Sequence, residues 1–81
     1  MRVMFQNLII SCDWIVCKNN RIYLGTNSRE IFYVLYDNHC DTHCAKMTLL
    51  NRGWLAVDNL HEAHNEEIDC IADLVYNRID W

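Results

Sequence analysis

Two stretches of the sequence hold the apolar, β-branched and aromatic residues that are typical of strands. Residues 3–10 are largely apolar and predict a first strand, and residues 11–13 (Ser-Cys-Asp) predict a turn after it. Residues 31–36 are β-branched or aromatic throughout, which predicts a central strand buried on both faces. A helix that begins at Ser28 is the competing interpretation of this second stretch.

A β-hairpin is predicted between these two stretches. The pair Asn19-Asn20 separates the short apolar-rich segments 14–18 and 21–24. Asparagine tolerates a positive φ better than most residues, so this pair suits a two-residue turn. The two segments should therefore pair as antiparallel strands.

A first helix is predicted from about Asp41 to Arg52. Asp41 can cap the exposed N–H groups, and Gly53 sits where a left-handed residue ends a helix. A short strand over residues 54–57 should follow. One face of the helical wheel is expected to pack inward, and it holds Cys40, His43, Cys44, Met47 and Leu50.

A last helix is predicted to begin at Asp58 or Asn59, or else at Asn65, and to end near Asp80. Glu62 is placed to close a capping box on Asn59. One side of this helix is mostly apolar and holds His61, His64, Ile68, Ile71, Ala72, Val75 and Ile79. The opposite side is acidic and holds Glu62, Glu66, Asp69, Asp73 and Asp80. The apolar side should pack on the sheet and the acidic side should face water.

These elements predict an α+β fold in a single compact domain, residues 1–81. We expect a small, mostly antiparallel sheet of three or four strands with two helices, the long C-terminal one packed on one face. A chain of 81 residues with 52% apolar residues supports a small core of this kind. An exposed sheet edge would allow two copies to pair as a homodimer.

Charge is unevenly distributed along the chain. The net charge is −4, but residues 1–57 carry +2 and residues 58–81 carry −6. Phosphate binding needs clustered Lys and Arg, so the acidic C-terminal third argues against direct nucleic acid contact. It favours a larger basic protein or protein complex as the partner.

Cysteine usage and apolar run lengths indicate a cytoplasmic protein without a membrane segment. The chain has five cysteines, an odd number, and no convincing secretory signal, so reduced thiols are expected. No apolar run approaches the roughly 18–20 residues that span a bilayer. With two glycines and no proline, the chain cannot build a Gly-rich phosphate loop, and we expect no cofactor.

Cysteine and histidine residues near the middle of the chain leave two alternatives open. Cys40, Cys44, His61 and His64 read as C-x3-C-x16-H-x2-H, which would suit a zinc-stabilised module. His39 and His43 are equally available as ligands. A cysteine nucleophile with His43 or His64 and Asp41 is the second alternative. The preferred interpretation is that these residues pack at the edge of the core, with no metal and no catalytic residue.

The favoured function is therefore a small acidic binding protein without catalytic activity. It would act as a stoichiometric inhibitor or adaptor on a larger basic partner, one that itself could handle nucleic acid. Viral anti-defence proteins and immunity proteins are often of this size and charge, which is an analogy of class only. The residues expected to bind the partner are Glu62, Glu66, Asp69, Asp73, Asp80 and Trp81.

Overall fold

Six strands and two helices make up the part of the chain that the computed structural model describes, the backbone of residues 1–77 and the side chains of residues 1–75. The order is β1 (Arg2–Phe5), β2 (Leu8–Lys18), β3 (Arg21–Thr26), β4 (Ile31–Leu35), α1 (His39–Arg52), β5 (Trp54–Ala56), β6 (His61–Glu62) and α2 (Asn65–Asn77). The strands form one sheet in the order β5-β1-β2-β3-β4-β6, in which only β1 and β5 pair in parallel. The predicted α+β class with two helices is confirmed. The sheet, however, is mixed and has six strands rather than three or four.

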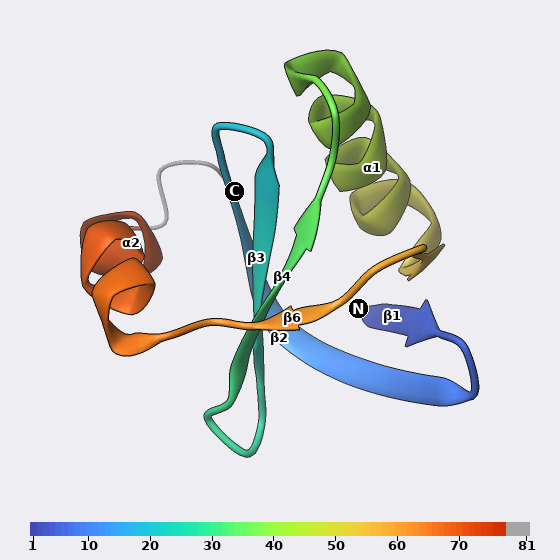
Figure 1. Ribbon diagram of the computed structural model, residues 1–81. Coiled ribbons are helices and arrows are strands. Elements are labelled where there is room, and N and C mark those ends of the chain that lie inside the picture. The colour runs from blue at the N-terminus through green and yellow to red at the C-terminus, as the bar shows by residue number, and fades with distance from the viewer. Residues whose placement is uncertain (78–81) are drawn as a thin grey trace.

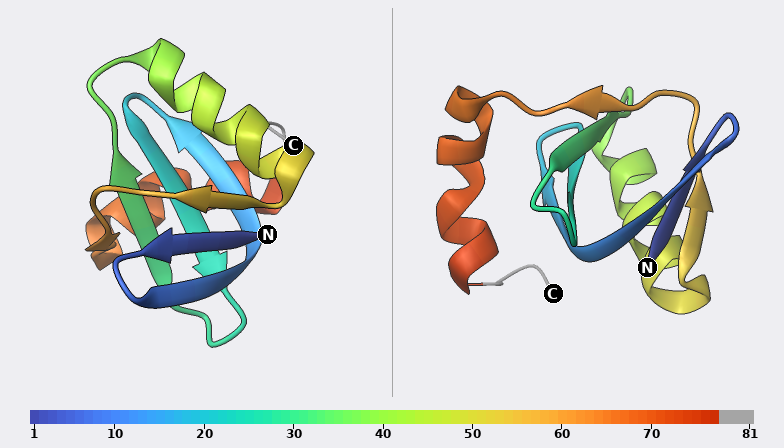
Figure 2. Two further views of the ribbon diagram at one scale, coloured as in Figure 1. Left: turned by 90° about the vertical axis from the view of Figure 1, so that its right-hand side faces the viewer. Right: turned by 90° about the horizontal axis from the view of Figure 1, so that it is seen from below.

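The two helices lie on opposite sides of the sheet (Figure 1; Figure 2). On the α1 side, Ala45 and Leu49 join the larger buried cluster, which also contains Val3, Cys12, Ile15, Ile22, Leu24 and Val34. On the α2 side, Ile71 packs with Tyr23 and Ala63. The outer surface of α2 therefore faces away from α1.

The first predicted strand is two strands in the structure. The chain turns at Gln6 and Asn7, and Gln6 has a φ of 54°. Phe5 then pairs with Leu8 across this turn. The two polar residues that interrupt the apolar run are the hairpin turn.

The turn predicted at residues 11–13 is wrong, because β2 continues through it. The register with β3 shifts between Cys12 and Trp14, which leaves Asp13 as the extra residue of a bulge. The first part of β2 pairs with β1 and the second part pairs with β3. A bulge bends a strand and increases its twist, and β2 curves visibly as it passes from one partner to the other (Figure 1).

The predicted hairpin at Asn19-Asn20 is confirmed. Asn19 has a φ of 55°, and Lys18 pairs with Arg21 across the turn. The strand buried along most of its length is β3, however, and not β4, in which Val34 is the one buried residue. β4 has only the two-residue β6 on its outer edge, so most of its residues stay partly exposed.

Helix α1 ends as predicted, but the face that packs on the sheet is not the one predicted. Gly53 has a φ of 81°, and its N–H donates to the carbonyl of Leu49 at 2.8 Å. The cap is Asn38, whose Oδ1 accepts from the N–H of Asp41 at 2.8 Å, so the helix begins two residues earlier than predicted. The residues that pack inward are Thr42, Ala45 and Leu49. The face predicted to be inner, comprising Cys40, His43, Cys44, Met47 and Leu50, is exposed.

The packing of α1 follows from side-chain size. Thr42 and Ala45 are small, so the helix can approach the sheet closely, and Leu49 fills the remaining space. The Thr42 hydroxyl also donates to the carbonyl of Asn38 at 3.2 Å, so it is buried with a partner. A wheel built on hydrophobicity alone cannot choose between two partly apolar faces.

Helix α2 begins at Asn65, so the predicted starts at Asp58 and Asn59 are wrong. The side chain of Asn59 instead pairs with the backbone of Leu35, accepting at 2.8 Å and donating at 3.1 Å. This contact continues the edge of β4, and residues 61 and 62 then form β6. The predicted end near Asp80 lies outside the described residues.

Candidate functional site

Three of the predicted partner-binding residues, Glu66, Asp69 and Asp73, lie together on α2. All three are exposed, and their spacing of three and four residues puts them on one face of the helix. Within the described part of the chain, none of them forms an ion pair. We call this surface the α2 acidic face.

The other predicted partner-binding residues do not belong to this face. Glu62 is exposed but lies in β6, where it pairs with Phe32, so it is a sheet-edge residue and caps no helix. The prediction that Glu62 shares a helix face with Glu66 is therefore wrong. Asp80 and Trp81 lie outside the described residues.

A fourth carboxylate of α2, Glu67, is directed at the sheet. Its Oε1 accepts from Nη1 of Arg21 in an ion pair, and its Oε2 accepts from the N–H of His64 at 3.2 Å. Arg21 also lies 4.7 Å from the centre of the Tyr33 ring, and Tyr33 stacks on His61 at 5.0 Å. Glu67 thus caps the start of α2 and ties it to β3.

The Glu67 contact should make stability depend on pH. Burial raises the pKa of Glu67, but the hydrogen bonds from Arg21 and from the His64 N–H outweigh it, so the pKa lies below its ordinary value. Such a group stabilises the fold above its ordinary pKa, and this contribution is lost as the pH falls through the lowered pKa. We therefore expect Glu67→Gln to lower the free energy of unfolding at pH 7 and to lower it less at pH 3.

Urea denaturation at both pH values measures this difference. Glu66→Gln is the matched control, because Glu66 is the exposed neighbour without an ion pair among the described residues, and its replacement should change little at either pH. An effect of Glu67→Gln that is equal at pH 7 and pH 3 would show that the Arg21 contact contributes nothing through charge.

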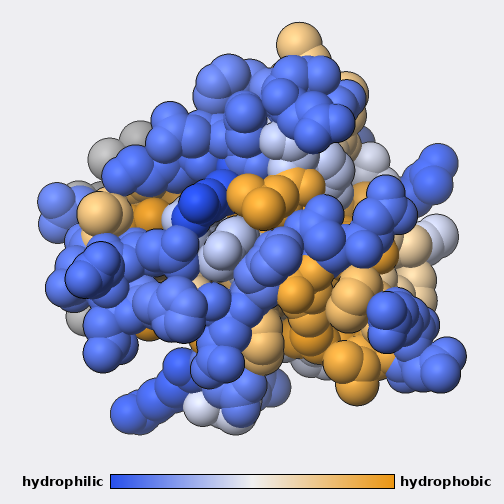
Figure 3. All heavy atoms as spheres, viewed as in Figure 1, coloured by the Kyte–Doolittle hydropathy of each residue, from blue (hydrophilic) through white to orange (hydrophobic). Residues whose placement is uncertain are grey.

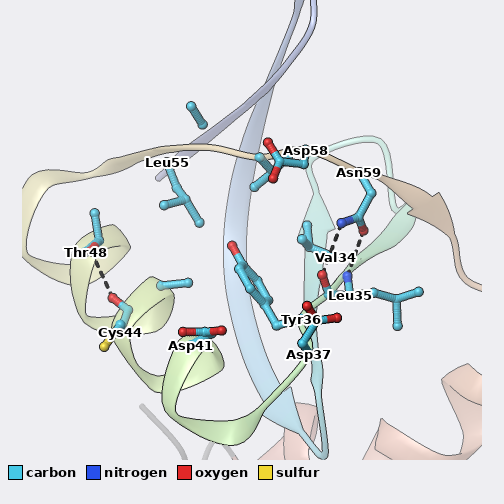
Figure 4. A pocket seen from close by; sticks show the side chains of 13 residues that line it. Val34, Leu35, Tyr36, Asp37, Asp41, Cys44, Thr48, Leu55, Asp58 and Asn59 are labelled. Carbon is cyan, nitrogen blue, oxygen red and sulfur yellow. Dashed lines mark hydrogen bonds between the residues drawn. The ribbon is translucent and has the colours of Figure 1, made fainter.

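A second acidic surface lies on the other side of the sheet, beside α1. A cavity of about 550 Å³ opens between α1, the end of β4 and the segment that joins β5 to β6 (Figure 4). Asp37, Asp41 and Asp58 line it, together with Tyr36, and no Lys, Arg or His is among its lining residues. We call this cavity the acidic hollow.

Tyr36 supplies the polar group at the centre of the acidic hollow. Figure 4 shows the carboxylates of Asp41 and Asp58 on different sides of its ring. Burial, followed by the charges of Asp58 and Asp41, raises the pKa of Tyr36. The phenol therefore stays protonated at neutral pH, and the hollow can offer one O–H donor and three carboxylates to a cationic group.

The acidic hollow was not predicted from the sequence. Its three aspartates come from the start of α1, from the link before it and from the link between β5 and β6. Nothing local in the sequence places Asp58 beside Asp41, since their proximity depends on β5 pairing with β1. The α2 acidic face was predictable because its spacing is local to one helix.

The four residues of the alternative zinc-stabilised module are not brought together. Cys40 and Cys44 lie on the exposed face of α1, His61 lies in β6 and His64 lies just before α2. Within residues 1–75, no group of three or more His, Cys, Asp or Glu side chains is placed to hold a metal ion. His61 lies in strand β6 and His64 lies outside it, so the two histidines are not on adjacent turns of one helix as the spacing had suggested.

The cysteines differ in their surroundings. Cys12 is buried, and burial raises its pKa to about 11, so it remains a protonated thiol at neutral pH. Cys40, Cys44 and Cys70 are exposed. The cysteine nucleophile considered above was Cys40 or Cys44, and both lie on the exposed face of α1 rather than on a buried one.

The two most exposed large apolar side chains of the described residues lie next to each other at the beginning of β2. Figure 3 shows hydrophobic surface on the side of the molecule that carries β1 and the start of β2. Leu8 is 58% exposed and Ile9 is 66% exposed at the beginning of β2. The pairing of two copies at a sheet edge stays a prediction.

Comparisons with known proteins find no match for this chain. No family model, no curated protein and no solved structure matches it. Of the helices described by the structure, neither is long and apolar enough to cross a membrane.

Proposed function

We propose that the protein is a small acidic binding protein without catalytic activity, and that the α2 acidic face contacts a larger basic protein. One observation carries the proposal. Glu66, Asp69 and Asp73 are exposed and form no ion pair within the described residues, whereas Glu67 of the same helix is paired with Arg21. The three charges are therefore available to a partner.

The electrostatic effect of this face is directional. Three like charges on one side of a helix create a field that steers a basic surface into contact and raises the association rate. Screening limits this field to about 8 Å at physiological salt, so the contact must be close. We propose a cytoplasmic inhibitor or adaptor, of the viral or immunity type, whose partner presents a basic surface such as one that handles nucleic acid.

The acidic hollow is the competing contact, because it is concave and could receive a single Lys or Arg side chain. The two surfaces can be compared at equal net charge. E66Q/D69N/D73N removes three charges from the α2 acidic face, and D37N/D41N/D58N removes three from the hollow. Any general effect of net charge is the same in both variants.

The partner is first captured from host extract on immobilised wild-type protein, identified and purified, and its affinity for each variant is then measured. We expect E66Q/D69N/D73N to bind on the order of 100-fold more weakly, mostly through slower association at low salt. We expect D37N/D41N/D58N to bind like the wild type. The reverse order of affinities would reject the α2 acidic face as the contact.

A further inference from the structure

The exposed face of α1 carries three sulfur atoms with helical spacing. Cys40, Cys44 and Met47 are all exposed, at positions i, i+4 and i+7. Free cysteine is among the residue types most often buried, so two exposed thiols on adjacent turns are unusual. Cys44 lies at the edge of the acidic hollow, and Figure 4 shows its sulfur directed away from Tyr36 at the centre of that hollow.

The geometry of a helix lets these three side chains converge. At 3.6 residues per turn the three positions fall within an arc of about 60°. Residues three or four apart have Cβ atoms about 5–6 Å apart, which two metal–sulfur bonds of about 2.3 Å can span. Met47 is long and unbranched, so its thioether can reach back toward the two thiols.

The sulfur atoms of these three side chains determine which metal ions they can bind. Thiolate and thioether sulfur bind soft cations, above all Cu(I), and are poor ligands for Mg²⁺ or Ca²⁺. The neighbouring positions on this side of α1 are His43, Thr48, Leu50 and Asn51, and the carboxylate of Asp41 lies one helical turn before Cys44. Within residues 1–75, no third His, Cys, Asp or Glu side chain is grouped with Cys40 and Cys44 to hold a metal, and Met47 is the other sulfur-bearing residue on this face of α1.

We propose that Cys40, Cys44 and Met47 form a three-sulfur site that binds one Cu(I) ion on the outer face of α1. Each thiol releases its proton to solvent as its sulfur binds the ion, and the ion keeps its oxidation state. Exposed side chains turn to close the site around the metal. This site is independent of the proposed partner contact, because α2 lies on the opposite side of the sheet.

Anaerobic titration with Cu(I), in competition with a chromogenic Cu(I) chelator, tests the proposal on the folded full chain. We expect one ion per chain, with affinity lowered on the order of 100-fold in C40S and in C44S and about tenfold in M47L. C70S is the matched control, since Cys70 is an exposed thiol on α2 with no second cysteine on that helix, and it should bind like the wild type.

Three results would overturn the site. One is unchanged Cu(I) affinity in the C40S/C44S double variant. Another is one ion shared by two chains, which would replace Met47 with a donor from a second copy. The third is an equal loss in C70S. Circular dichroism of each variant shows that it is folded, which is expected because all the replaced side chains are exposed.

Discussion

Replacing Ile71 with alanine is expected to lower the free energy of unfolding by about 3 kcal/mol, a large share of the stability of a domain of this size. Ile71 is 0% exposed and is the one buried residue among the described side chains of α2. It packs with Tyr23 of β3 and with Ala63. Its truncation leaves a cavity between helix and sheet that the strands cannot close.

Urea denaturation followed by circular dichroism measures the effect of Ile71→Ala. Cys70→Ala is the matched control on the same helix, because Cys70 is exposed and its replacement should cost less than about 0.5 kcal/mol. If the two variants are equally stable, Ile71 does not hold α2 on the sheet.

Replacing Gly25 with alanine is expected to destabilise the sheet by about 2–3 kcal/mol. Gly25 is buried in β3 and pairs with Trp14 of β2. A Cβ atom at Gly25 would overlap the indole ring of Trp14, which lies directly over the glycine. The ring cannot shift without losing its packing against the α2 side of the sheet.

A double-mutant cycle isolates this contact. In the background of Trp14→Ala, where the indole is absent, Gly25→Ala should cost less than about 1 kcal/mol. Equal costs of Gly25→Ala in the two backgrounds would mean that the Trp14 ring is not the obstacle.

Local signals in the sequence predicted the features that depend on a few adjacent residues. Asn19 and Asn20 form a turn because asparagine accepts a positive φ, and Gly53 ends α1 because glycine accepts a left-handed conformation. The spacing of Glu66, Asp69 and Asp73 placed them on one helix face for the same local reason. These predictions needed no knowledge of the rest of the fold.

Features set by distant pairing could not be predicted. β5 is three residues long and β6 is two, and each is defined by its partner strand rather than by its own sequence. The β6 pairing removes Glu62 from the acidic side of the helix. The segment between β5 and β6 carries Asp58, so the pairings of these two strands also place Asp58 at the acidic hollow. The outward face of α1 was misassigned because close packing selected Ala45 over larger apolar residues.

The native cysteines offer two attachment points for a cross-linker that maps the partner contact. Cys70 lies one helical turn from Glu66 on α2, and Cys44 lies on α1 at the other side of the sheet. Two variants, each retaining only one of these cysteines, can carry the same thiol-linked photo-cross-linker. The rest of the surface is then identical in the two proteins.

Photo-cross-linking of these two proteins to the purified partner is the most direct test of the α2 acidic face as the binding surface. We expect covalent adducts from the cross-linker at Cys70 and none from the cross-linker at Cys44. Adducts from Cys44 alone would contradict the proposed contact and would place the partner on the α1 side of the sheet.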